Sequence, residues 1–257
     1  LPECIWPTKK ETKFSKCHVY SCLKCFHLQL QNFSKKRISE FYGENQCNTD
    51  SSLIKKKRLM VIKKKYGKNY FKNKKILDVG GGVNPVLKDN NVFIADMIIQ
   101  KINKKIYKNR YYEIDIEEKK INQKFDIIFL IHTLEHFKYP FKAIKNIRSS
   151  LKNDGRLFIE IPNFNFMMKN KTYYSIFHQH LSMFTLKHLQ NFLNLSSLKI
   201  DKLFNENGII FCSVKKIDLK KNKILHIDNK NIFRIFKKNH NLMKKKLLSH
   251  LKKNKFN

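Results

Sequence analysis

A run of three glycines carries the strongest chemical signal in this chain. The segment Lys75-Ile-Leu-Asp-Val-Gly-Gly-Gly-Val-Asn84 is an apolar run that ends in an acid and then in the glycines. Glycine is needed where the backbone adopts unusual dihedral angles or approaches a ligand closely, because a Cβ would block both. A second short apolar run, Val92 to Asp96, also ends in an acid. Glycines and acids at the carboxyl ends of parallel strands are typical of nucleoside binding, which we therefore expect here.

The cysteines suggest a second kind of chemistry near the start of the chain. Cys22 and Cys25 form a Cys-x-x-Cys knuckle flanked by strand-like residues. Four thiolates at such spacing suit tetrahedral zinc, so we predict a structural zinc ion held by Cys4, Cys17, Cys22 and Cys25. The set is irregular, because the residue that would complete a second knuckle with Cys4 is Leu1. A ribbon without metal and a disulfide remain alternatives, although a cytosolic protein rarely forms disulfides.

Histidines and a glutamate follow another apolar run, Phe125 to Ile131. The residues His132-Thr-Leu-Glu-His136 spell His-x-x-Glu-His, a motif of some zinc proteases. That chemistry requires the motif within a zinc-binding helix, whereas here it directly follows a buried strand. We therefore reject the protease interpretation and expect His136 to be a packing or capping residue.

The elements that would position these residues alternate between strands and helices. Such alternation predicts an α/β fold with a mostly parallel, Rossmann-like sheet, helices on both faces and an antiparallel last strand. A helix over 50–66 would bury Leu53, Ile54, Met60 and Val61. Strands are expected near 75–80, 92–96, 111–115, 125–131 and 156–161, a helix over 140–152, and an antiparallel pair over 198–204 and 208–214.

The order of these motifs resembles the class I S-adenosylmethionine-dependent methyltransferases, over about residues 50 to 215. The resemblance implies that Asp96 binds the two ribose hydroxyls of the cofactor, and that Asp115 and Ile116 lie beside its adenine. It also implies that Asp78 and the glycines border the methionine part and that the end of the fourth strand lines the pocket. The remaining cofactor contacts implied are therefore Gly80, Gly81, Gly82 and His132.

The segment Phe177-His-Gln-His-Leu-Ser-Met-Phe184 is similar to one that sugar C-methyltransferases place over the substrate. Those relatives often have Tyr-His-Glu-His there, so Phe177 and Gln179 depart from the pattern. Carried over by position, His180 would be the general base, with His178 beside it. A histidine suits this role because it accepts a proton near neutral pH. The alternative is that both histidines are polar contacts of a lid.

The strongly basic composition raises the question of whether the partner is a nucleic acid or a small molecule. The formal net charge is +34, but only six of the 54 basic residues are arginines, and asparagine and isoleucine are abundant. We interpret this as a solvated lysine surface of compositional origin, against the alternative of a surface selected for polyanions. The expected function is methyl transfer to a small molecule such as a nucleotide-linked sugar. An RNA methyltransferase and a non-catalytic module with the same fold are the alternatives.

Domain boundaries follow from these segments. We expect a Cys-rich, zinc-ribbon-like segment over 1–33, a helical connection over 34–70, the cofactor-binding domain over 71–216 and a lysine-rich tail over 217–257. The tail has a helical apolar stripe, which favours an amphipathic helix or linker over a membrane-surface helix. No targeting segment or apolar run of ~20 residues is visible, so we expect a cytoplasmic protein.

Overall fold

The computed structural model describes residues 18–31, 52–81, 85–99, 101–170, 180–218 and 225–227, with positions 229, 234 and 238. Its centre is a seven-stranded sheet in the order β5-β4-β3-β6-β7-β10-β9. The parallel strands are β3 (Ile76–Val79), β4 (Val92–Asp96), β5 (Tyr111–Glu113), β6 (Phe125–Ile131) and β7 (Leu151–Pro162). β10 (Ile209–Lys216) is antiparallel to both β7 and β9 (Leu198–Asn205). The predicted Rossmann-like sheet with an antiparallel end is confirmed.

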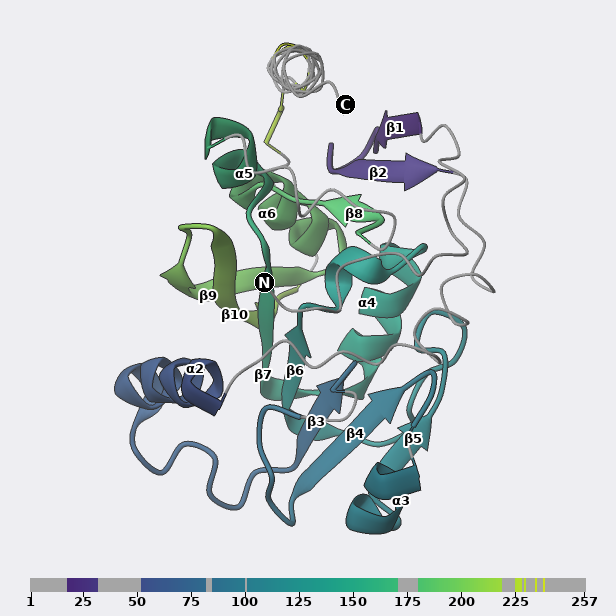
Figure 1. Ribbon diagram of the computed structural model, residues 1–257, viewed down its shortest axis with the longest axis vertical. Helices are drawn as coiled ribbons and strands as arrows, with labels where there is room; N and C mark the ends of the chain where they lie inside the picture. Colours follow the sequence, from purple (N-terminus) through teal and green to yellow (C-terminus); the bar gives the residue numbers. More distant parts are fainter. Residues whose placement is uncertain are drawn as a thin grey trace, which may run out of the picture.

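Strand alternation divides the core into two layers. Leu77 and Val79 of β3 pack in one cluster, whereas Ile76 packs in the other, since successive side chains point to opposite faces. The first cluster includes residues of α4 (Pro140–Ser150) and α6 (Leu186–Leu195). The second includes Ile62 of α2 (Ser52–Tyr66) and Tyr107 of α3 (Lys101–Tyr107). Helices therefore cover both faces of the sheet (Figure 1).

The predicted buried face of the first helix is wrong. Leu53, Ile54, Met60 and Val61 are all exposed, whereas the buried residues of α2 are Arg58 and Ile62. The apolar residues of this helix do not form one stripe, and a buried ion pair between Arg58 and Glu160 of β7 determines which side faces the sheet. A charged residue, Arg58, is therefore buried in place of the four apolar residues that were expected to be.

The boundary between α4 and β7 also differs from the prediction. The helix ends at Ser150, and the strand begins at Leu151 instead of near residue 156. Leu151 is fully buried and pairs with Phe125 of β6, so burial and pairing extend the strand where a helix was expected to continue. The other strands begin and end within two residues of their predicted limits.

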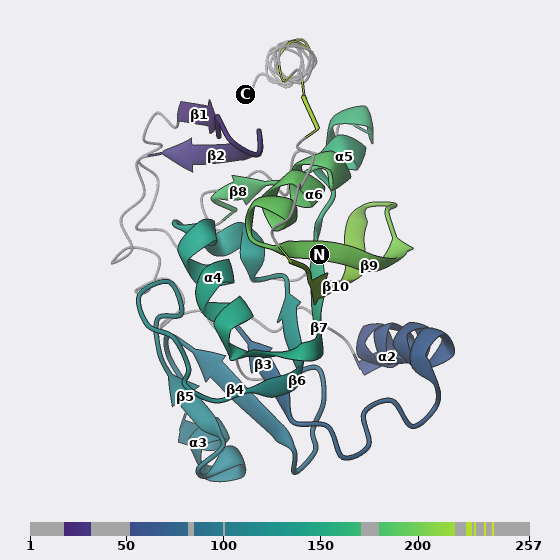
Figure 2. The same ribbon diagram turned by 180° about the vertical axis from the view of Figure 1, so that it is seen from behind.

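A second, three-stranded sheet lies at the carboxyl end of the parallel strands. It joins β1 (His18–Ser21) and β2 (Leu28–Gln31) to β8 (Ser182–Met183), which belongs to the distant segment after His180. In Figures 1 and 2 this sheet, α6 and α5 (Phe164–Asn170) gather at the end toward which the arrows of β3 and β6 point. Residues 18–31 of the predicted Cys-rich segment thus pair with a strand that follows β7 in the chain. The predicted tail helix falls largely outside the described residues.

Candidate functional site

The glycine turn begins where β3 ends. Gly80 has φ +73, and its N–H donates to the carbonyl of Ala95 at 2.8 Å. A Cβ at Gly80 would lie 2.5 Å from Oγ1 and 2.6 Å from Cγ2 of Thr133. A Cβ at Gly81 would lie 3.0 Å from Cγ of Asp78. The sequence therefore uses glycine here for both dihedral angle and close packing. Gly82 lies outside the described residues.

Asp78 is 2% exposed, and its Oδ2 accepts a hydrogen bond from the N–H of Val86 at 2.6 Å. It thereby connects β3 to the chain beyond the glycine turn. Burial raises the pKa of this carboxyl to about 7, against the opposing effect of the Val86 hydrogen bond. A cation beside Asp78 would favour its ionised form.

The other predicted cofactor residues lie along the same edge. Asp96 is the last residue of β4, is half-buried, and its carbonyl accepts from the N–H of Ile114 at 2.8 Å. Asp115 accepts through Oδ1 from the N–H of Glu117 at 2.9 Å. Ile116 is buried, and its carbonyl accepts from the Asn146 side chain at 2.8 Å. The ends of β3, β4 and β5 thus bring these residues to one side of the sheet, as the alternating pattern predicted.

His132 follows β6 with φ +48, which is unusual for a residue other than glycine. Its Nε2 lies 3.0 Å from Oε1 of Glu160, and its Nδ1 lies 3.4 Å from Oε1 of Glu135. Arg58 contacts both oxygens of Glu160, at 2.6 and 2.7 Å. Burial opposes ionisation of His132, but the two carboxylates raise its pKa to about 10. The group is a network of alternating charges in which Arg58 and the two glutamates are buried and His132 is partly exposed.

This network gives Glu160 and His132 opposite charges. Burial would raise the pKa of Glu160, but Arg58 and His132 lower it to about 2. Arg58 was missed in the sequence, since a charged residue in a lysine-rich helix resembles a solvated one. A single arginine among the lysines of α2 was the available signal.

A second cluster lies beside this network. Leu134–His136 form a single 3₁₀ turn after β6, so the His-x-x-Glu-His residues do not share an α-helix. The rings of His136 and His180 meet edge to face, with centroids 4.9 Å apart. Glu135 is 2% exposed and lies with these two histidines. The structure therefore brings His180 against residues 135–136, while residues 177–179, His178 among them, fall outside the described residues.

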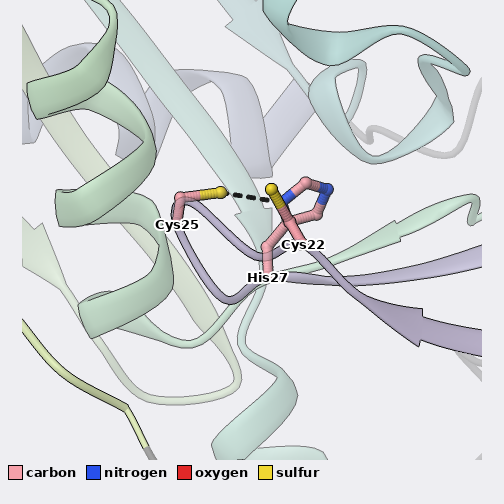
Figure 3. A group of neighbouring side chains, drawn as sticks. All are labelled: Cys22, Cys25 and His27. Atoms are coloured by element: carbon pink, nitrogen blue, oxygen red, sulfur yellow. Dashed lines mark hydrogen bonds between the residues drawn. The ribbon is translucent and has the colours of Figure 1, made fainter.

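The cysteine knuckle forms a third cluster, shown in Figure 3. Sγ of Cys25 lies 2.9 Å from Nδ1 of His27, and donor atoms of Cys22, Cys25 and His27 all lie within 4.8 Å of one another. Hydrogen bonds from Cys25 and then His27 lower the pKa of Cys22 to about 3, whereas the contact with Cys22 raises that of Cys25. His27 was missed, although a histidine two residues beyond Cys-x-x-Cys was visible. Cys4 and Cys17 lie outside the described residues.

Comparison with known proteins decides the family. Residues 54–203 match the family described as methyltransferase domain, and this match covers more than half of the chain. The chain belongs to this methyltransferase family. An uncharacterized protein of Methanocaldococcus jannaschii is 31% identical over 122 residues, which cover 44% of this methyltransferase and 54% of that relative. The match thus spans about half the length of the relative.

Solved structures share the fold of the methyltransferase. A 1,6-didemethyltoxoflavin-N1-methyltransferase from Burkholderia thailandensis is 12% identical with TM-score 0.51, covering 79% of this chain and all of that one. A protein from Pyrococcus horikoshii is 15% identical with TM-score 0.52, covering 73% of this chain and 100% of that one. The mitomycin 7-O-methyltransferase is 11% identical with TM-score 0.50, covering 71% of this chain and 58% of that one. At these identities the likeness shows the fold.

Family membership implies S-adenosylmethionine as the methyl donor, and the residues of the cofactor edge fit it. The buried carboxyl of Asp78 has a raised pKa, so a ligand that carries a sulfonium and an ammonium group would favour its ionised form. Asp96 stands at the end of the neighbouring strand, β4.

Among the described residues, no helix is both long and apolar enough to span a membrane.

Proposed function

We propose that this protein transfers a methyl group from S-adenosylmethionine to a small molecule. The observation that carries the proposal is the glycine turn between two strand-end acids, Asp78 and Asp96, in a chain that belongs to a methyltransferase family. Such an edge is where open α/β sheets bind nucleosides. The neighbouring solved structures named for small-molecule methylation support the acceptor class.

Each residue at the edge has a role in this proposal. Asp96 accepts hydrogen bonds from the ribose hydroxyls, and Ile116 packs beside the adenine with Asp115 next to it. The methionine part lies over the turn that begins at Gly80 and Gly81, beside the carboxylate of Asp78, and Gly82, the next residue in the sequence, is a further proposed contact. His132, which is held by two carboxylates, limits the pocket at the end of β6.

The acceptor lies at the end of the sheet where α5, α6 and β8 gather. A small pocket there is lined mostly by apolar residues, with Glu135, His180 and Ser182 as its polar members; the others are Ile161, Pro162, Phe164, Met167, Met183 and Phe184. Apolar walls with few polar groups are typical of small-molecule sites. A nucleotide-linked sugar is the acceptor class we propose, and the positive charge of the chain would attract it.

Bound S-adenosylmethionine supplies a methyl group on sulfur to a nucleophile in line with it. The protein then has to orient the acceptor and receive its proton. We propose His180 as that general base, with His178, two residues earlier in the sequence, as the second candidate. His180 lines the acceptor pocket and lies against His136, which supports this position.

For the knuckle we propose a structural zinc ion with Cys22, Cys25 and His27 as ligands. Thiolate and imidazole are the ligands of structural zinc sites, and Cys17 or Cys4 is the candidate for the fourth. Cys25 is fully buried in the main core cluster. The N–H of Leu30 donates to the carbonyl of Leu181 at 2.8 Å. The knuckle would therefore stabilise the segment that carries His180.

Calorimetry with S-adenosylmethionine tests the proposed function. Asp96→Ala should weaken binding by about 1.5–3 kcal/mol, through loss of charge-assisted hydrogen bonds. Asp89→Ala is the matched control, because Asp89 is an exposed acid of the preceding turn. If Asp96→Ala binds S-adenosylmethionine as tightly as the wild type does, Asp96 is not part of the site. Absence of binding by the wild type would refute the proposed function.

A further inference from the structure

Glu135 is a buried carboxylate whose surroundings are not complete. It is 2% exposed, and neither of its oxygens accepts a hydrogen bond within the part of the chain that the structure describes. Nδ1 of His132 lies 3.4 Å from Oε1 as an ion-pair contact, without hydrogen-bond geometry. Buried polar groups in native proteins are nearly always satisfied, so an exception indicates a missing ligand, ion or water.

Two histidines complete a possible ligand set around this carboxylate. One donor atom each from Glu135, His136 and His180 lies within 4.8 Å of the other two. Ligand atoms about 2.0–2.2 Å from one ion can be separated by up to about 4.4 Å, so a small adjustment brings all three to one centre. Two imidazoles and a carboxylate form the ligand set of open divalent sites in which the remaining positions are left for substrate.

The residues behind Glu135 resemble the outer shell of a metal site. His132 faces Oε1 of Glu135, which leaves Oε2 for an ion. His132 is fixed in turn by Glu160, and Glu160 by Arg58. Outer contacts of this kind orient a ligating carboxylate.

We propose that Glu135, His136 and His180 bind one divalent transition-metal ion at the acceptor pocket. The site is separate from the cysteine knuckle and of different chemistry, since it offers nitrogen and oxygen in place of sulfur. Glu135 and His180 both line the pocket, so the open positions of the ion would face an acceptor oxygen.

This role rests on the proposed function and refines it. An acceptor hydroxyl bound to the ion would lose its proton to water more readily, because the ion stabilises the oxygen anion. With the ion bound, His180 is one of its ligands and acts on the acceptor through the ion. The acceptor proton then passes to water and not to His180. Without the ion it remains the general base.

Binding of Mn²⁺ tests the site without any acceptor. The full chain, stripped of metal, is titrated with Mn²⁺ while the free ion is followed by electron paramagnetic resonance. Mn²⁺ is chosen because it favours oxygen and nitrogen over thiolate. We expect one equivalent to bind, at least about tenfold more weakly in Glu135→Gln and His180→Asn, as loss of one ligand implies.

Control variants separate the possible results. His226→Asn, which alters an exposed histidine, should leave Mn²⁺ binding unchanged. His136→Asn provides a second test if Glu135→Gln fails to fold. Absence of Mn²⁺ binding, or equal binding by wild type, His136→Asn and His180→Asn, would overturn the metal site. S-adenosylmethionine affinity, measured on the same samples, reports on the proposed function independently.

Discussion

Replacement of Gly80 by alanine tests the packing of the glycine turn. At φ +73 an alanine is strained by about 1–2 kcal/mol relative to glycine. The added Cβ also meets Oγ1 and Cγ2 of Thr133 at 2.5 and 2.6 Å, and overpacking of this kind costs about 1–3 kcal/mol. The free energy of unfolding should therefore fall by about 2–5 kcal/mol in Gly80→Ala.

A second substitution separates the two causes. Thr133→Ala removes both colliding atoms and leaves only Cβ, 3.2 Å from the new methyl group. Alone it should cost about 1–2 kcal/mol, because the single hydroxyl proton on Oγ1 is shared between the carbonyls of Val79 and Ile131, at 3.1 and 2.9 Å. In the double variant the overpacking should largely disappear, whereas the φ strain should remain.

Urea unfolding of the four proteins provides the assay. The loss in the double variant should be smaller than the sum of the single losses by about 1–3 kcal/mol. Losses that add within about 0.5 kcal/mol would show that Gly80 and Thr133 do not interact, and would refute the close packing of the turn. S-adenosylmethionine affinity should fall in Gly80→Ala and recover in part in the double variant.

Three further predictions concern the other clusters. The raised pKa of Asp78 means that, between about pH 4 and 7, the unfolded state loses a proton that the folded state keeps, so stability should fall as pH rises through this window. Urea unfolding across this range should show a smaller fall in Asp78→Asn, and equal slopes would contradict the assignment. Cys22→Ser with Cys25→Ser should lower bound zinc from about one equivalent to less than about a tenth, and wild-type protein without zinc on metal analysis would leave a metal-free ribbon. His180→Asn should lower turnover by roughly 10² to 10⁴ with unchanged cofactor affinity, and His178→Asn should do less; equal effects of the two would reduce the segment to a lid.

Local sequence determined the strands of the central sheet and the glycine turn at the end of β3. Alternation within β3 and β6 assigns Leu77 and Ile128 to one core layer and Ile76 and Ile127 to the other, because side chains of a strand point to alternate faces. The glycine turn was equally local, since dihedral angle and close approach constrain Gly80 itself. These features depend on neighbours a few residues apart, which is why the family resemblance and the predicted sheet agree with the structure.

Only the tertiary structure decided which distant residues meet. Arg58 and Glu160 are 102 residues apart, and their ion pair buries a face of α2 that no hydrophobic period marks. Glu135 meets His180, and β2 pairs with β8, because the sheet brings separate loops to one end. Pairing between remote segments leaves no periodic pattern in either one, so local periodicity could predict the strands and the glycine turn but not that Glu135, His136 and His180 meet.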